Sequence, residues 1–433
     1  MKLKSFLSVV FFCGITLINS MFAVAQDTLD YYAEGFLRYE NFIYKSNIKT
    51  VVFEQENLKL SEPVIDLGRG ERLLLSFDDL EGDFKNYSYT LIHCNANWVP
   101  SNLLENEYLN GFAEDRIVNY RSSFNTTQPY TRYWQEIPGR EVQPIVSGNY
   151  LVKVFIEGEP NFPILTRRML ILQPKANIEA DVHQATIVQD RYSKQEIDFS
   201  IFYQGIQVSN PFEDIKVVVM QNGRWDNAIT GLKPLFLRDN ELEYSYDEEN
   251  TFNGGNEYRT FDLRTLRVQT QFVRDIVQGP DGYTIVLTTG RSRSFDRYSI
   301  ENDINGKYLI KNQDGFDNEL GSEYVKVKFS LKHDILANGN FYVFGALTDW
   351  RLTTESKMVY NYDEEVYETL LYLKQGYYDY QYVFLEDGAK LPDETIIEGN
   401  HYETTNEYTV LVYFRPLGGR YDQLIGLRRF ESR

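Results

Sequence analysis

Short runs in which apolar and polar residues alternate recur along most of the chain. The clearest runs in the first part cover residues 72–77, 150–156 and 168–172, and turn-forming residues such as Gly, Asn and Asp lie between them. Alternation with a period of two is typical of strands that are buried on one face. Several such strands at short spacing predict a β-sandwich over residues 45–174.

The strand pattern continues through the rest of the chain, and convincing helical periodicity is hard to find. Further apolar or alternating runs cover residues 178–182, 197–201, 215–220, 283–287, 308–310, 341–350, 367–373 and 376–384. Residues 239–256 are acidic and rich in glycine and asparagine, which predicts a long loop or the rim of a sheet. Residues 313–319 are predicted to be a linker.

The first 25 residues have the pattern of a signal peptide. Lys2 and Lys4 precede a mainly apolar stretch, and a small-x-small pattern ends at Ala25. Cleavage there leaves 42 basic and 63 acidic residues, a net charge of −21, and one of the two cysteines. Such a chain repels nucleic acid and anionic lipid, and it cannot form an internal disulfide. No later stretch is apolar over the roughly 18 to 20 residues that a membrane-spanning helix needs.

His93 and Cys94 have the side chains of a thiol catalytic site, and they follow a predicted strand at residues 87–92. Neighbouring residues of a strand point to opposite faces, so these two cannot form a nucleophile and base pair with each other. We expect Cys94 to be a small buried hydrophobic residue. The sequence has no phosphate-binding glycine loop, nucleophile elbow or helical zinc motif, and we predict that the protein is not an enzyme. An enzyme would need a carboxylate pair or an activated Cys94.

Residues 301–306 are similar to the start of a calcium loop, with oxygen-bearing Asp303 and Asn305 at alternate positions. Asn312 stands where such a loop carries a bidentate glutamate. Asn305-Gly306 is also the dipeptide most typical of a hairpin turn, because both residues tolerate positive φ. We favour the turn, leave open whether Asp303 and Asn305 bind calcium, and predict no cofactor.

Residues 345–350 and 376–384 resemble the early-set immunoglobulin-like modules that bind starch and glycogen. In those modules exposed aromatic rings stack on sugars, which would make Trp350 and Tyr377 contacts for a glycan or another partner. Alternation places four aromatic residues on the face opposite Tyr377, namely Tyr378, Tyr380, Tyr382 and Phe384. We expect this aromatic stripe, and Trp350 with it, to be core, so the resemblance is better evidence for fold than for ligand.

The stretch 89–103 contains five conspicuous residues, His93, Cys94, Trp98, Pro100 and Asn102. Other ordered motifs occupy residues 63–68, 74–80, 107–112, 123–126, 129–131, 147–151, 165–168 and 303–306. Together these motifs resemble the type IX secretion system plug protein family. The resemblance implies no chemistry, so the five residues of this stretch are expected to be a structural signature.

The resemblance also implies a function. Such a protein is a non-catalytic periplasmic accessory that binds the periplasmic mouth of the very large outer-membrane β-barrel translocon and plugs it when no cargo is passing. We expect it to be peripherally associated with the outer membrane through that barrel, as a monomer in a hetero-complex. Its negative charge would favour a basic rim on the barrel and a salt-sensitive association. The alternative is an exported glycan-binding protein that uses its C-terminal sandwich.

We therefore expect an all-β fold of three tandem β-sandwich domains of immunoglobulin-like or early-set type. An N-terminal sandwich is expected at residues 26–175, a middle β-rich domain at 176–318 and a C-terminal early-set-like sandwich at 319–433, after a cleaved signal peptide at 1–25.

Overall fold

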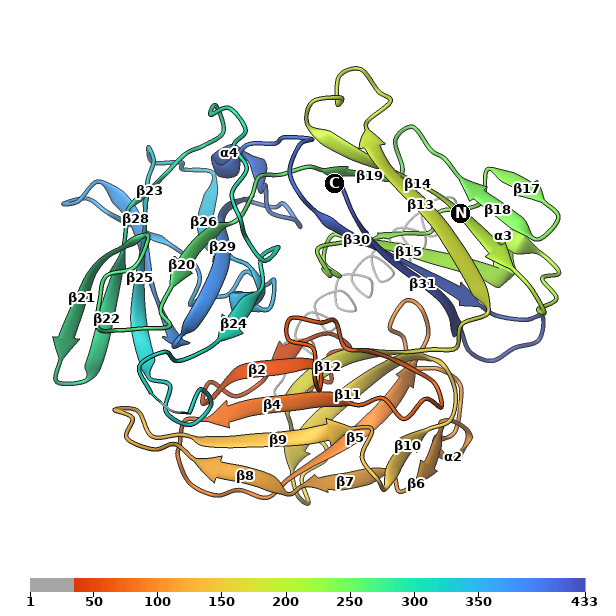
Figure 1. Cartoon of the computed structure of the whole chain (residues 1–433), viewed down its shortest axis with the longest axis horizontal. Coiled ribbons are helices and arrows are strands. Elements are labelled where there is room, and N and C mark those ends of the chain that lie inside the picture. The colour runs from red at the N-terminus through yellow and green to blue at the C-terminus, as the bar shows by residue number, and fades with distance from the viewer. Residues whose placement is uncertain (1–34, 316, 433) are drawn as a thin grey trace, which may run out of the picture.

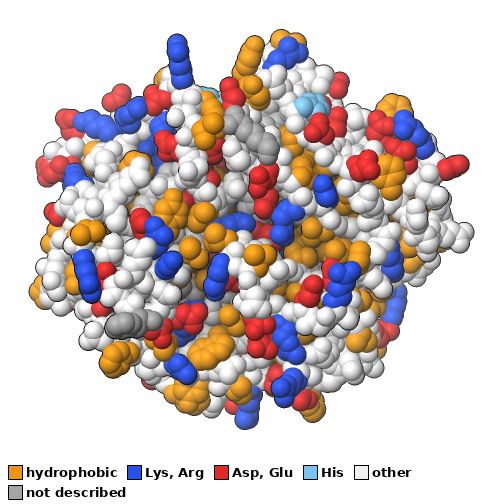
Figure 2. Space-filling view, viewed as in Figure 1, with side chains coloured by type: hydrophobic (Ala, Val, Ile, Leu, Met, Phe, Trp, Pro, Cys, Tyr) orange, Lys and Arg blue, Asp and Glu red, His pale blue; other side chains and the backbone are white. Residues whose placement is uncertain are grey.

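The computed structural model describes residues 35–315 and 317–432, and the predicted signal peptide lies outside these residues. Strands make up 47% of the chain and helices 4%, so the predicted all-β class is confirmed. Three two-layered units, here the first, second and third sandwich, lie around a common centre (Figure 1). Acidic and basic side chains are interspersed over the same face (Figure 2). Among the helices of the described residues, none has the length and apolar character needed to cross a membrane.

The first sandwich packs a four-stranded sheet against a six-stranded one. The smaller sheet has the order β2 (Ile48–Gln55), β4 (Leu73–Asp79), β9 (Thr131–Ile137) and β8 (Asn119–Ser122). The larger has the order β1 (Phe42–Ile43), β12 (Pro163–Leu172), β11 (Gly148–Ile156), β5 (Tyr87–Cys94) and β7 (Glu114–Ile117), with β3 (Val64–Asp66) parallel to β12. Helix α2 (Glu105–Tyr108) leads into β6 (Leu109–Gly111), which pairs with β10 (Val142–Pro144). Alternate residues such as Leu75 and Val152 fill one core between the two sheets.

The second sandwich combines strands from two distant parts of the chain. One sheet has the order β13 (Ala176–Gln184), β14 (Lys194–Tyr203), β18 (Glu241–Tyr244) and β17 (Phe236–Arg238), with β19 (Thr251–Asn253) also paired to β14. The other has the order β16 (Ile229–Thr230), β15 (Ile215–Gln221), β30 (Glu407–Phe414) and β31 (Gln423–Glu431), and α3 (Pro211–Asp214) precedes β15. Val217 of β15 and Val412 of β30 are register partners and share one core.

The third sandwich is built around the long strand β29 (Gly376–Glu386). It pairs with β20 (Arg259–Asp262), β24 (Tyr308–Ile310) and β26 (Gly339–Phe344). The facing sheet has the order β21 (Val273–Gly279), β22 (Gly282–Leu287), β25 (Tyr324–Lys332), β28 (Val366–Lys374) and β27 (Val359–Asn361), with β23 (Gly290–Arg291) beside β25. Two short helices, η1 (Ala346–Thr348) and α4 (Thr395–Glu398), follow β26 and β29. The aromatic stripe of β29 lies in the core, as predicted.

The third sandwich is inserted into the second. The chain leaves the second sandwich after β19 and returns to it only with β30, so the segment 319–433 supplies strands to both units. The predicted boundary between the middle and C-terminal domains, at residue 318, does not agree with this pairing. The strand at 283–287, which falls within the predicted middle domain, belongs to the third sandwich. The sequence of β30 has the apolar pattern of a buried strand, but such a pattern does not specify which distant strand is its neighbour. The predicted loop or rim at 239–256 contains β18 and β19.

Candidate functional site

His93 lies at the end of β5 and packs among tyrosines. Its side chain is buried, and its ring centroid is 4.9 Å from that of Tyr150 and 5.3 Å from that of Tyr421. Its Nε2 donates to the carbonyl oxygen of Ser147 at 3.3 Å. Burial lowers the pKa of His93 to about 4, so the imidazole is neutral at neutral pH. His93 is therefore a packing residue.

Cys94 points to the opposite face, into an apolar cluster that joins the first and second sandwiches. Leu151 of the first sandwich and Val218 and Leu411 of the second belong to the same cluster, and all are fully or almost fully buried. Burial raises the pKa of the Cys94 thiol to about 12, so the nucleophilic thiolate is scarce at neutral pH. The prediction that Cys94 is a small buried hydrophobic residue is confirmed.

A tight loop after Cys94 turns a tryptophan toward the second sandwich. Pro100 forms an isolated bridge with Cys94, and the amide of Asn95 donates to the carbonyl of Val99 at 2.8 Å. Trp98, inside this loop, has a φ of 63°, a conformation that a bulky residue keeps only when its surroundings hold it.

The Trp98 indole is held by an aromatic and cationic stack across the boundary. Its ring meets Trp225 of the second sandwich edge-on, with centroids 5.0 Å apart. The guanidinium carbon of Arg168 lies 4.3 Å from the Trp98 centroid and 5.2 Å from the Trp225 centroid. Such a contact between a buried ring and a partly buried guanidinium stabilises by about 0.5–2 kcal/mol.

Polar groups beside this stack also join the two sandwiches. Asp422, buried before β31, accepts from Lys216 at 2.9 Å, from Arg415 at 2.8 Å and from the amide of Ala96 at 3.0 Å. Arg415 also donates to the side-chain oxygen of Asn95 at 2.7 Å. Asp422 is 1% exposed, so removing both Lys216 and Arg415 would leave its charge buried without compensation.

The five predicted signature residues thus lie at or next to one joint. Asn102, at the far end of the stretch, accepts through its carbonyl from Arg420 of the second sandwich at 3.5 Å, and Arg420 pairs with Glu107. We call this contact between the first and second sandwiches the signature joint.

A second joint connects the first and third sandwiches through a buried ion cluster. Asp78 of β4 accepts from Lys374 of β28 at 2.6 Å, from Arg132 of β9 at 3.2 Å and from the Tyr324 hydroxyl at 2.7 Å. Asp78 and Lys374 are both fully buried. Burial lowers the pKa of Lys374 to about 8, and the Asp78 carboxylate opposes that shift.

A third joint connects the second and third sandwiches. The buried Arg224, which follows β15, makes a bidentate pair with Glu394 at 2.6 and 2.8 Å and also binds Asp226 at 2.6 Å. Gln381 of β29 donates to Glu394 at 2.7 Å. The three sandwiches therefore close on one another, each held to both of its neighbours.

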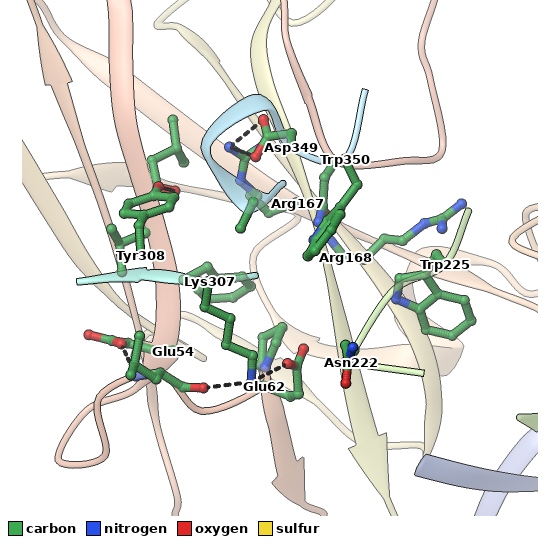
Figure 3. A pocket seen from close by; sticks show the side chains of 18 of the residues that line it. Glu54, Glu62, Arg167, Arg168, Asn222, Trp225, Lys307, Tyr308, Asp349 and Trp350 are labelled. Carbon is green, nitrogen blue, oxygen red and sulfur yellow. Dashed lines mark hydrogen bonds and ion pairs between the residues drawn. The ribbon is translucent and has the colours of Figure 1, made fainter. Parts of the chain in front are cut away.

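The three units meet at a central cavity of about 350 Å³ (Figure 3). Charged groups on its wall are paired across units: Arg167 of β12 binds Asp349 at 3.1 Å, and Lys307 binds Glu62 at 3.1 Å. Trp350 also lines it. Pairing of this kind holds the sandwiches together and leaves neither carboxylate as a free base.

Trp350 and Tyr377 have different surroundings. Trp350 is partly buried, its ring contacts Phe344 and Tyr258, and the Arg224 guanidinium carbon lies 4.7 Å from its centroid. Tyr377 is half-buried on β29, with the guanidinium carbon of Arg264 5.6 Å from its ring. Both rings are thus engaged by cationic side chains of the chain itself.

Residues Asn305 and Gly306 form the predicted turn, with φ values of 54° and 76°. The strand that follows the turn, β24, pairs with β29, so the turn does not connect two neighbouring strands. Asp303 accepts from the amide of Asn305 at 2.9 Å and also from the amide of Tyr258. Both Asp303 carboxylate oxygens therefore already have backbone partners.

Few of the charged residues at the joints could be predicted from the sequence. Asp78 and Arg167 lie in stretches 74–80 and 165–168 that carry the family resemblance. Lys374, Arg224 and Asp422 have no such signal, because a charged residue in a strand becomes a buried ion pair only when a distant partner is present.

Two comparisons with known proteins found matches to this chain. The type 9 secretion system plug protein 1st domain matches residues 48–173, which correspond to the first sandwich. The crystal structure of a hypothetical protein from Parabacteroides merdae is similar, with 35% sequence identity and a TM-score of 0.88, over 91% of this chain and 100% of that chain. A search of curated proteins found no match.

Proposed function

Because this chain belongs to the type IX secretion system plug protein family, we propose that it binds the periplasmic mouth of the large outer-membrane translocon barrel and closes it when no cargo is passing. The family match over residues 48–173 is the observation that carries this proposal. Membership of this family gives the chain a type IX secretion-related role.

The joints support a blocking role. A plug must keep its shape against a wide opening, and the buried ion cluster at Asp78 and the stack at Trp98 fix the relative positions of the sandwiches. Separating the sandwiches would break these charge pairs and would expose to water the apolar cluster that contains Leu151, Val218 and Leu411. The protein would therefore work as one body and would leave the pore by moving away as a whole.

The features that could indicate chemistry have packing roles. His93 is neutral and enclosed, Cys94 is buried as a thiol, and the paired groups at the central cavity are neutralised by one another. We propose a non-catalytic protein that acts by binding, as a monomer in a hetero-complex. Glycan binding is less well supported, because Trp350 and Tyr377 each have an internal guanidinium beside the ring.

The proposal is tested by a pull-down from detergent-solubilised outer membranes of the source bacterium, with tagged protein, residues 26–433, as the bait. One very large barrel protein identified by mass spectrometry is the expected co-purifying partner. A matched sample in which Lys374→Met and Asp78→Ala loosen the second joint controls for non-specific capture through exposed apolar surface. Recovery of polysaccharide or small lipoproteins without the barrel would contradict the proposal.

A further inference from the structure

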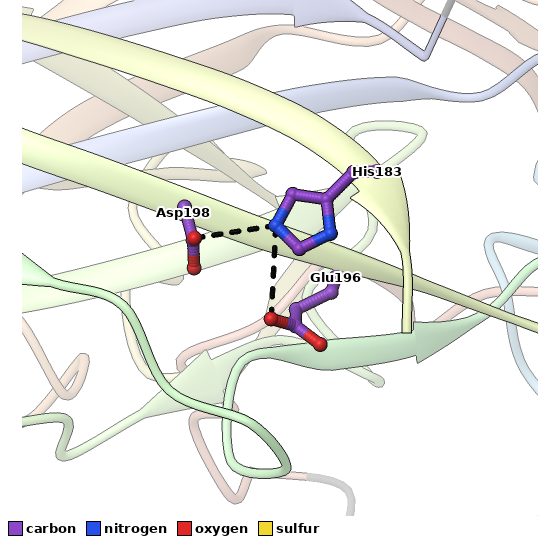
Figure 4. Close-up of side chains that lie close together, drawn as sticks. All are labelled: His183, Glu196 and Asp198. Carbon is purple, nitrogen blue, oxygen red and sulfur yellow. Dashed lines mark hydrogen bonds and ion pairs between the residues drawn. The ribbon is translucent and has the colours of Figure 1, made fainter. Parts of the chain in front are cut away.

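The edge hairpin of the second sandwich holds a side-chain cluster that lies apart from the three joints. His183 of β13 is the register partner of Glu196 of β14, and Asp198 lies two residues further along the same face. Figure 4 shows one nitrogen of the imidazole facing both carboxylates. Each residue offers one atom that could bind a metal ion, and these atoms lie within 4.8 Å of one another. His183 Nε2 faces Glu196 Oε1 and Asp198 Oδ2.

The other ring nitrogen of His183 fixes the tautomer. Nδ1 lies 2.8 Å from the carbonyl oxygen of Gln184, and a carbonyl can only accept, so Nδ1 carries the hydrogen. A carboxylate also only accepts, so without a metal ion Nε2 donates to Asp198 Oδ2 at 3.2 Å, and a bound ion would replace that hydrogen while Nδ1 keeps its own. A backbone carbonyl on Nδ1 is the usual partner that orients a histidine for metal binding through Nε2.

The distances that make these contacts ion pairs are also compatible with a shared cation. Nε2 is 3.2 Å from Asp198 Oδ2 and 3.6 Å from Glu196 Oε1. Charge-assisted N–H···O bonds are about 2.7–2.9 Å long. Ligand atoms of a tetrahedral zinc ion with bonds of about 2.0–2.1 Å lie about 3.3–3.4 Å apart. Both observed separations are close to that edge length.

Neutral donors hold each carboxylate in place. Thr186 donates to Glu196 through its amide at 2.6 Å and its hydroxyl at 3.1 Å, and Asn250 donates to Asp198 at 3.1 Å. Asp181 is the register partner of Asp198 and adds a third negative charge. Within the described residues, no lysine or arginine lies at ion-pair distance from Glu196 or Asp198.

An acidic group elsewhere in the molecule shows the contrast. Asp79, Glu81 and Asp83 also place their oxygens together, but Lys85 binds them at 2.6, 2.6 and 2.5 Å. A lysine therefore already neutralises that group. The cluster on the edge hairpin has two ligand carboxylates, a correctly oriented imidazole and no such cation.

We propose that His183, Glu196 and Asp198 bind a divalent transition-metal ion, with zinc as the preferred ion. Imidazole nitrogen and carboxylate oxygen are both zinc ligands, and a partly exposed site leaves a fourth position for water. The ion would cross-link β13 and β14 at the open end of their hairpin. This inference does not depend on the proposed function.

The test is isothermal titration of untagged protein, residues 26–433, with zinc chloride at pH 7.5. One equivalent of zinc is expected to bind with micromolar or tighter affinity. His183→Gln should weaken binding by at least about 100-fold, because it removes a ligand, and Thr186→Val by about 10-fold, because it frees a carboxylate that the hydroxyl orients. The control is His333→Gln, a histidine after β25 that should leave zinc affinity unchanged.

X-ray absorption of the zinc-loaded protein gives a second readout. The expected first shell contains one histidine nitrogen and oxygen ligands and no sulfur. If His183→Gln fails to fold, Asp198→Asn provides the same comparison with an isosteric side chain. The inference is overturned if zinc does not bind the wild-type protein saturably, or if it binds His183→Gln and Asp198→Asn as tightly as wild type.

Discussion

His93 should make the protein less stable in weak acid. Burial lowers the pKa of the folded imidazole to about 4, whereas an exposed histidine has a pKa of about 6.5. The unfolded chain therefore binds a proton that the folded protein does not bind when the pH falls below about 6.5. The stability that this neutral histidine provides is fully present above pH 6.5 and is lost as the pH falls toward 4.

The size of the effect follows from these two values. At pH 5 the unfolded histidine is almost fully protonated and the folded one is about one-tenth protonated, so the free energy of unfolding falls by about 2 kcal/mol relative to pH 8. His93→Gln removes this contribution but keeps a donor for the Ser147 carbonyl. The variant should be less stable than wild type at pH 8, and its stability should fall by about 2 kcal/mol less between pH 8 and pH 5.

Urea unfolding followed by tryptophan fluorescence at pH 8 and pH 5 measures both losses. Tyr108→Phe is the matched control, because it removes a hydroxyl from a ring neighbour of His93 and leaves the imidazole in place. This control should keep the wild-type pH dependence. Equal losses in wild type and His93→Gln, within about 0.5 kcal/mol, would refute the assignment of His93 as a buried neutral packing residue.

Three further predictions concern the buried thiol, the second joint and the surface charge. Cys94 should not react with a chromogenic disulfide reagent in the folded protein, because burial keeps it as a thiol. It should react stoichiometrically in urea, and a rapid reaction of the folded protein would contradict its buried position. Lys374→Met should lower the free energy of unfolding by about 3–5 kcal/mol by leaving Asp78 buried without its closest cation, and adding Asp78→Asn should restore part of this loss. Equal stability of the single and double variants would show that the pair is not coupled. With a net charge of −21 after removal of the predicted signal peptide, the protein should bind the translocon about tenfold more weakly in 0.5 M than in 0.05 M salt, and an unchanged affinity would exclude a charged interface.

Local strand formation could be predicted from the sequence, but the order in which strands pair could not. The alternation in residues 376–384 correctly placed Tyr378, Tyr380 and Tyr382 in a core. The segment that follows was assigned to the same unit, although β30 pairs with β15, almost 200 positions earlier. A strand carries the pattern of its own two faces, whereas its neighbour is decided by the whole topology.

The same limit applies to the site. Adjacent positions on a strand were enough to separate His93 from Cys94, because that argument needs only local geometry. They could not show that Cys94 faces a second sandwich, or that Trp98 would meet Trp225 more than 100 residues away. The cluster of His183, Glu196 and Asp198 was likewise hidden, since its ligand spacing appears only once β13 and β14 are in register.

The plugging account is tested most directly by the conductance of the purified translocon in planar lipid bilayers. The open barrel should pass ions, adding this protein to the periplasmic side should close it, and washing the protein away in high salt should reopen it. A barrel that binds the protein but keeps its full conductance would contradict the account.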